Sequence, residues 1–168
     1  MKFKSKTMNE FSEDKLIEQT AIKIFGELWG KDNFANAYSG ETDAEFGREN
    51  PGEVVLMNYL KIALTKLNPD VSTEALNLAI DEIIKDRSAM SIVNANHEMW
   101  QSLRDGVKVE TENEKGEQQT ETVKVIDFEN PKANHFMLVS QLWITGELHT
   151  RRPDLIGFVN GLPLVLVE

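Results

Sequence analysis

The sequence predicts an α/β protein in which a mixed β-sheet is flanked by helices. Up to about residue 105, several segments carry apolar residues at helical spacings of three and four. From about residue 107 onward, short apolar or alternating segments lie between turn residues, which is typical of strands. Helices therefore come first along the chain and strands later. A chain of 168 residues suits one domain spanning 1–168.

Helical segments are expected to be separated by residues that begin or end helices. Ser72 is a residue type that caps helix N-termini, and Gly106 can adopt the left-handed backbone that ends a helix. Pro69 disfavours helical backbone in the residue before it. The expected helices cover about 12–30, capped by Ser12, then 53–67, a segment that opens after Ser72, and about 89–103. A loop rich in Asn, Gly and acidic residues is expected over 31–52.

The strand candidates follow in the last third of the chain. Residues 107–109 and 123–126 alternate apolar with polar side chains around an acidic turn, which indicates a solvated hairpin at the surface. A mostly apolar strand is expected over 136–145. Residues 154–168 read as two more strands joined at Asn160-Gly161, a dipeptide typical of hairpin turns.

Composition and charge exclude several classes of protein. The chain has no cysteine, so disulfides and thiolate metal sites are excluded. Its formal net charge of −10 argues against a protein that binds nucleic acid through its general surface charge, because affinity for DNA comes largely from Lys and Arg. No apolar run is long enough to cross a membrane, and no secretory signal is visible. We expect a cytoplasmic protein.

The residues most suggestive of chemistry lie in the last two expected strands. Each carries one acid at the end away from the turn, Asp154 on the first strand and Glu168 on the second; we call these two residues the acid pair. Two neighbouring carboxylates repel each other, and a divalent metal ion relieves that repulsion. The alternative interpretation is that both strand ends simply reach solvent, where acids are common.

An acid followed, across a hairpin, by Glu and then one residue later by Lys is the pattern of the PD-(D/E)xK nucleases. This sequence supplies Pro153-Asp154 and Glu168 and ends there, so the lysine is expected beyond it. The segment RRPDLIGFVNGLPLVLVE is similar over its full length to the nuclease block of the restriction subunit of type I restriction enzymes. Other segments that resemble the same family are 18–21, 67–69, 103–107 and 126–131.

The resemblance implies a restriction-endonuclease-like fold and Mg²⁺-dependent hydrolysis of phosphodiester bonds in double-stranded DNA. Asp154 and Glu168 would be the metal ligands, and Glu18 matches a position where the family often has a further acid. Arg151 and Arg152 precede the first acid and could bind phosphate. Without its lysine, this stretch alone is expected to be inactive. The implied partners are DNA and the modification and specificity subunits, and the ATP-driven motor would belong to another part of the subunit.

Several alternatives stay open at this stage. The domain could keep the nuclease fold but serve only to grip DNA or dock subunits. Glu18 could be an ordinary helix-surface residue, and the arginine pair could simply balance nearby acids such as Glu147. The histidines lack ligand spacing and are not expected to bind metal, and the tryptophans are expected in the core; these residues are His97, His135, His149, Trp29, Trp100 and Trp143.

The metal hypothesis also makes a demand on the hairpin. Because side chains alternate between the faces of a sheet, a regular two-residue turn would send the two acids to opposite faces. We therefore expect a three-residue turn over 159–161 with a bulge at Gly161, which would pair Asp154 with Leu166 and keep both acids on one face, with Glu18 approaching them.

Overall fold

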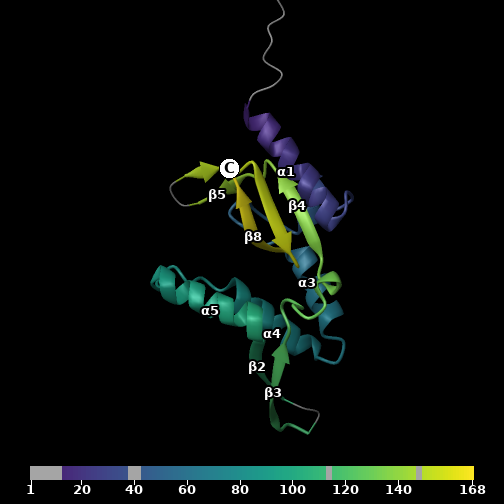
Figure 1. The fold of residues 1–168 in the computed structure, drawn as a ribbon. Coiled ribbons are helices and arrows are strands. Elements are labelled where there is room, and N and C mark those ends of the chain that lie inside the picture. Colours follow the sequence, from purple (N-terminus) through teal and green to yellow (C-terminus); the bar gives the residue numbers. More distant parts are fainter. Residues whose placement is uncertain (1–12, 38–42, 113–114, 147–148) are drawn as a thin grey trace, which may run out of the picture.

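The computed structural model describes residues 13–37, 43–112, 115–146 and 149–168. A four-stranded mixed sheet has the order β1–β4–β7–β8 (Figure 1). Its strands are β1 (Phe34–Asn36), β4 (Phe136–Ser140), β7 (Leu155–Val159) and β8 (Leu162–Val167). β1 pairs parallel with β4, and the other neighbours pair antiparallel. The predicted α/β class with a mixed sheet is confirmed.

Most helices agree with the sequence pattern, although their first residues differ. They are α1 (Glu13–Trp29), α2 (Asp43–Phe46), α3 (Met57–Leu67), α4 (Thr73–Ile84), α5 (Ile92–Asp105) and the 3-10 turn η1 (Pro131–Ala133). α3 begins at Met57 rather than at residue 53, because the backbone N–H of Leu56 donates to the carbonyl of Gly161, 2.9 Å away. The N-cap expected at Ser12 lies outside the described residues.

The segment 31–52 is not the plain loop that its composition indicated. It contains β1 and α2, two elements of three and four residues. Elements this short lack a full period of apolar residues, so pattern alone does not detect them. β1 forms only because β4, about a hundred residues later, supplies its partner: Phe34 pairs with Leu138 and Asn36 with Ser140.

Helices cover both faces of the sheet. On one face α1 packs through Trp29, whose ring stacks on Phe136 with centroids 5.2 Å apart and lies against Gly157. On the other face a buried cluster includes Phe46, Leu56, Val139, Ile156 and Phe158. Alternate residues of β7 therefore face α1 on one side and the helices α2 and α3 on the other.

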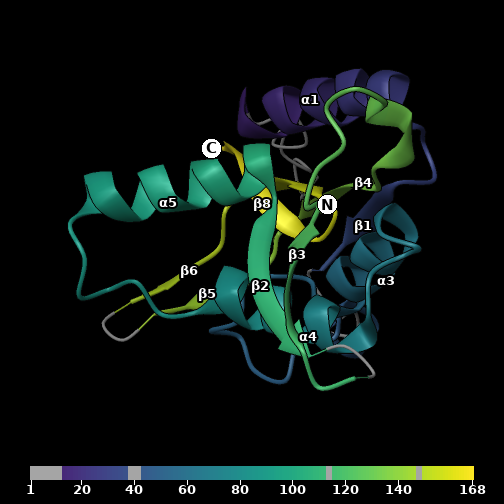
Figure 2. The same cartoon turned by 90° about the horizontal axis from the view of Figure 1, so that it is seen from below.

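A second buried cluster lies between α3, α4 and a separate hairpin, β2 (Val107–Glu112) with β3 (Gln118–Val123) (Figure 2). Burial alternates along β2, and Val107, Val109 and Val123 are buried. The expected hairpin is therefore confirmed: most of its polar positions are exposed, and its apolar positions are covered by α4. The strands also run further toward the turn than predicted.

β4 ends at Ser140 instead of continuing to residue 145. Gln141 has a φ of 59°, in the left-handed region, and this turns the chain out of the sheet. A small hairpin follows, formed by β5 (Ile144–Thr145) and β6 (Thr150–Arg151). This hairpin and α5 extend from the same side of the molecule (Figures 1 and 2). In the described part of the chain, we find no helix with the length and apolarity of a membrane span.

Candidate metal centre at the ends of β7 and β8

The turn between β7 and β8 is a two-residue turn, so the expected three-residue turn is wrong. Val159 pairs directly with Leu162, and both turn residues have positive φ, 52° at Asn160 and 80° at Gly161. Asn160 is fully buried, and both the oxygen and the nitrogen of its side-chain amide form hydrogen bonds. It accepts from the N–H of His135 at 2.7 Å and donates to the carbonyl of Val125 at 2.8 Å. These bonds fix Asn160 as a turn residue.

A bulge in β8 changes the register between the turn and the strand ends. Phe158 pairs with Pro163 and Gly157 with Val165, so Leu164 is an extra residue in β8. Proline has no N–H to donate to the ladder, which accounts for an irregularity at this place. Without the bulge, a two-residue turn would set Asp154 opposite Val167.

The bulge instead brings the acid pair into register. Leu155 pairs with Val167, and one step further along both strands the next residues are Asp154 and Glu168. Directly opposite residues of antiparallel strands project to the same face, with Cα atoms about 4.5–5.5 Å apart. The bulge expected in the turn thus lies within β8, and continuing the register by one residue sets the two acids directly opposite each other rather than diagonally.

The acid pair lies at the end of the hairpin and is at least partly open to solvent. Asp154 is half-buried and Glu168 is exposed. Asp154 is anchored through its backbone, because its carbonyl accepts from the N–H of Gln141 at 3.1 Å. No side chain within the described ranges forms a hydrogen bond or an ion pair with either carboxylate. Two adjacent carboxylates without a compensating cation are suited to a divalent ion.

Glu18 does not complete a three-ligand group. It lies half-buried in the first half of α1, and in both views the C-terminal end of the chain lies near that half (Figures 1 and 2). However, α1 covers the Gly157 face of β7, and alternation assigns Asp154 to the Ile156 face. Among the residues described, no three His, Cys, Asp or Glu side chains gather closely enough to hold a metal ion.

The two arginines lie directly before the acid pair. Arg151 ends β6 opposite Ile144, and both Arg151 and Arg152 are exposed. Arg152 places its guanidinium over the ring of Trp143, 5.2 Å from the centroid. Trp143 is 45% exposed and Trp100 is 50% exposed, so the expectation that they belong to the core is wrong for both. Single-sequence patterns gave no signal for this aromatic contact.

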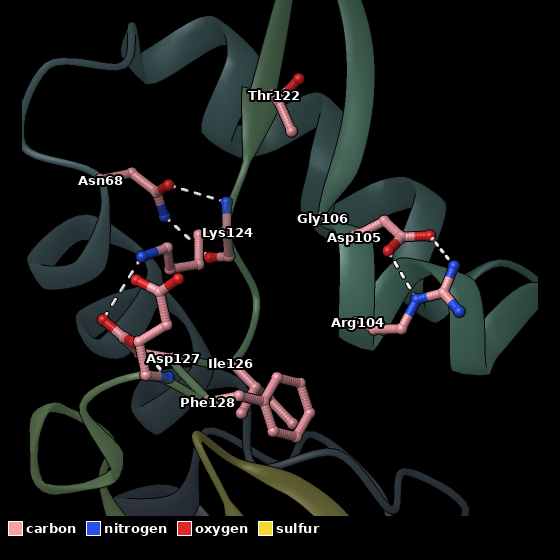
Figure 3. A pocket seen from close by; sticks show the side chains of 10 residues that line it. Asn68, Arg104, Asp105, Gly106, Thr122, Lys124, Ile126, Asp127 and Phe128 are labelled. Atoms are coloured by element: carbon pink, nitrogen blue, oxygen red, sulfur yellow. Dashed lines mark hydrogen bonds and ion pairs between the residues drawn. The ribbon is translucent and has the colours of Figure 1, made fainter.

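A groove of about 500 Å³ lies elsewhere, between the end of α5 and the segment after β3 (Figure 3). Its charged groups are largely paired with one another: Arg104 bonds to Asp105, and Lys124 lies 3.3 Å from Asp127. Neither acid of the acid pair lines it. The segment that forms it packs around Asn160, at the turn end of the hairpin, whereas the acids lie at the other end, about 17 Å along the strands.

Comparison with known proteins adds a family to this geometry. The model of the family described as "Type I restriction enzyme R protein N terminus (HSDR_N)" matches residues 10–168. The chain belongs to this family. The match covers both acids and the arginines before them, and it confirms the resemblance noted in the last segment and in the four earlier segments.

Two relatives within the type I restriction enzymes illustrate the relationship. The type I restriction enzyme HindI endonuclease subunit of Haemophilus influenzae is 40% identical over 131 residues, 75% of this chain. The putative type I restriction enzyme MjaIXP endonuclease subunit of Methanocaldococcus jannaschii is 29% identical over 163 residues, 95% of this chain. The chain spans only 12% and 15% of the lengths of these relatives.

Proposed function

We propose that this chain is the DNA-cleaving module of a type I restriction enzyme, in which Asp154 and Glu168 hold Mg²⁺ for hydrolysis of phosphodiester bonds in double-stranded DNA. The observation that carries the proposal is the β8 bulge, which pairs Leu155 with Val167 and so leaves the two acids at equivalent positions just beyond the last pair of the hairpin. The chain belongs to a family of restriction-enzyme subunits, and DNA cleavage is therefore the reaction that we propose for this pair of carboxylates.

The chain's own residues divide the work between holding the metal and holding the DNA. When bound, the metal would neutralise charge on the phosphate and lower the pKa of a coordinated water. Asp154 and Glu168 supply its carboxylate ligands. Arg151 and Arg152 would bind phosphates next to the site, because planar guanidinium groups match phosphate oxygens in bidentate geometry. Because α1 covers the other face of β7, we propose for Glu18 a role outside the set of metal ligands, at the periphery of the site.

The wider assembly is proposed from the family resemblance and not from the structure of this chain. We propose that modification and specificity subunits direct the complex to its DNA site. The ATP-dependent motor would lie in the part of the subunit that this chain does not include. A second candidate function is a module of the same fold that grips DNA or docks subunits without chemistry. The acidic net charge and the uncompensated acid pair favour the metal-dependent enzyme.

The decisive change is Asp154→Asn in the complete restriction complex. We expect plasmid cleavage to fall by at least about 100-fold, the scale seen when a group that stabilises transition-state charge is removed. ATP hydrolysis should stay at the wild-type rate because it belongs to a separate module. Glu168→Gln should behave in the same way. The matched control is Glu129→Gln, an exposed acid away from the acid pair, which should retain full cleavage.

A second measurement separates metal binding from activity. Calorimetric titration of the purified chain with Mn²⁺ should show one weak site that Asp154→Asn removes and Glu129→Gln retains. Cleavage that survives Asp154→Asn would rule out the metal assignment and favour the gripping or docking role. Loss of ATP hydrolysis in a folded variant would contradict the modular interpretation. Unchanged cleavage with Glu18→Gln would remove Glu18 from the site.

A further inference from the structure

Trp143 is held rigidly while its ring remains at the surface. Arg48 is buried, with only 5% of its surface exposed. Its guanidinium group donates to the carbonyl oxygen of Trp143 at 2.7 Å and to that of Pro51 at 3.0 Å. Two residues further along the chain from Trp143, the N–H of Thr145 also donates to the carbonyl oxygen of Pro51, at 2.9 Å. The backbone around Trp143 is therefore fixed to the body of the protein, yet 45% of this large apolar residue faces solvent.

The ring forms a pair with Arg152. The β5–β6 pairing of Ile144 with Arg151 places Trp143 opposite Arg152 one step further, and the guanidinium carbon lies 5.2 Å from the ring centroid. Arg152 is separated from Asp154 by Pro153 alone, and Pro153 is buried. The pair is thus tied, through a short and constrained segment, to the edge that carries the acid pair.

The chemistry of this pair suits a nucleic-acid backbone. Stacking uses the face of a guanidinium group, whereas phosphate binding uses the N–H groups in its plane, so the two contacts are compatible. An exposed indole beside it offers a flat apolar surface for a deoxyribose or a base. In a chain of net charge −10, DNA has to be met by a locally cationic segment, and Arg151 and Arg152 provide one.

A second tryptophan–arginine pair, Trp100 with Arg104, allows a comparison within the same chain. On α5 the guanidinium of Arg104 lies 4.0 Å above the ring of Trp100, which is 50% exposed. Arg104, however, lies on α5 and lines the groove at the turn end of the β7–β8 hairpin, which neither acid of the acid pair lines. The second pair therefore has the same chemistry as the first pair but does not lie beside the acids.

We propose that Trp143 and Arg152 form a DNA-positioning surface that seats the sugar-phosphate backbone beside the acid pair. This inference rests on the proposed function. Arg152 binds a phosphate close to the scissile bond, and Trp143 orients the guanidinium and packs against the adjoining sugar. Trp100 and Arg104 make no such contact. Trp143 is a positioning residue, because it acts on the DNA and on Arg152 rather than on the reacting atoms.

The test measures affinity for a fluorescently labelled 20-base-pair duplex by anisotropy, with Ca²⁺ in place of Mg²⁺ to prevent cleavage. We expect Trp143→Ala to weaken binding about 10-fold, as loss of an interface tryptophan does. Trp143→Phe should recover most of the affinity, and the matched control Trp100→Ala should stay within about 2-fold of the wild type. Circular dichroism and thermal midpoints confirm that each variant is folded.

The salt dependence of binding separates the two residues. Arg152→Ala should reduce the slope of log affinity against log salt by about one, because one phosphate contact is lost. Trp143→Ala should leave that slope unchanged. Arg152→Lys should keep the slope but lose affinity. An ammonium group carries the same charge, but it cannot stack on an aromatic ring or bind a phosphate through two parallel hydrogen bonds as a guanidinium group does.

Several outcomes would overturn the proposal. Wild-type affinity in Trp143→Ala, or an equal loss in Trp100→Ala, would remove the special role of this pair. Unchanged DNA affinity together with failed assembly of the complex would assign the surface to a protein partner instead. Cleavage by the Asp154→Asn complex keeps the proposal distinct from the proposed function: if that complex still cleaves DNA, the metal assignment fails, whereas the comparison of Trp143→Ala with Trp100→Ala in the binding assay is unaffected.

Discussion

Among individual residues, Asn160 has the greatest influence on where the acids lie. Its side chain bonds to His135, Val125 and Asn134, and so ties the β7–β8 turn to the segment that runs from β3 to β4. Its own backbone N–H donates to the carbonyl of His135 at 2.8 Å. A buried amide that satisfies several backbone groups leaves each of them unpaired when it is removed, and each unpaired group costs about 1–3 kcal/mol.

Asn160→Ala should therefore lower the free energy of unfolding by about 2–4 kcal/mol, measured by urea denaturation. The alanine also has to adopt the φ of 52° found at this position, which disfavours side chains with a Cβ. Asn160→Gly loses the same hydrogen bonds without that strain, and we expect it to be about 1 kcal/mol more stable than Asn160→Ala. Wild-type stability in Asn160→Ala, or no difference between the two variants, would contradict this account.

At the scale of secondary-structure elements, the sequence predicts those features that depend on local chemistry. Ser72 caps α4 by accepting from the N–H of Ala75 at 3.1 Å, and Gly106 ends α5 with a φ of 81°. The two acids at the far ends of the last strands also follow from alternation and turn chemistry alone. These features depend on residues that are close together in the sequence.

Features that depend on distant partners were not predictable in this way. The turn length depends on Asn134 and Val125, which hold Asn160, and the bulge follows Pro163 in β8. The strand β1 forms only against β4. The surface position of Trp143 depends on Arg48, 95 residues away, which fixes its backbone outside the sheet. Candidate site residues were visible in the sequence, but their register was not.

One junction between elements responds to pH. Glu121 of β3 accepts hydrogen bonds from the Thr111 hydroxyl at 2.7 Å and from the Ser72 N–H at 3.1 Å. These bonds stabilise the carboxylate and lower the pKa of Glu121, with the Thr111 contact as the largest cause. Because the folded pKa lies below the unfolded value, the contribution to stability is complete above the ordinary glutamate pKa. It is lost as the pH falls from about 4.5 through the lowered folded value.

Glu121→Gln should thus flatten the fall in thermal midpoint as the pH drops below the ordinary glutamate pKa of about 4.5, where the wild-type residue takes up its proton. Thr111→Val removes the main donor and should flatten the same part of the curve to a smaller extent. Thermal melts followed by circular dichroism at several pH values provide the measurement. An acid limb as steep in Glu121→Gln as in the wild type would show that this junction does not contribute.

At the scale of the whole molecule, α3 connects the two buried clusters. Leu60 and Leu64 point into the cluster with α4 and the β2–β3 hairpin, whereas Leu56, just before α3, belongs to the cluster on the sheet. Leu162 of β8 also packs into the first cluster, although its strand is part of the sheet. Each cluster is bounded by elements that also belong to the other cluster. We therefore predict that the two clusters unfold together, in one cooperative transition.

Leu64→Ala tests this prediction, because Leu64 is fully buried and lies in the cluster away from the sheet. The cavity should cost about 2–5 kcal/mol of unfolding free energy. Trp29, which stacks on Phe136 of the sheet, reports the other side of the molecule once Trp100 and Trp143 are replaced by phenylalanine. We expect urea transitions followed by Trp29 fluorescence and by circular dichroism to coincide before and after the substitution, and to move together.

If the Trp29 transition keeps its midpoint while circular dichroism separates into two steps, the clusters unfold independently. The register at the acid pair would then depend on the sheet alone, and substitutions around α4 and the β2–β3 hairpin would leave DNA cleavage intact.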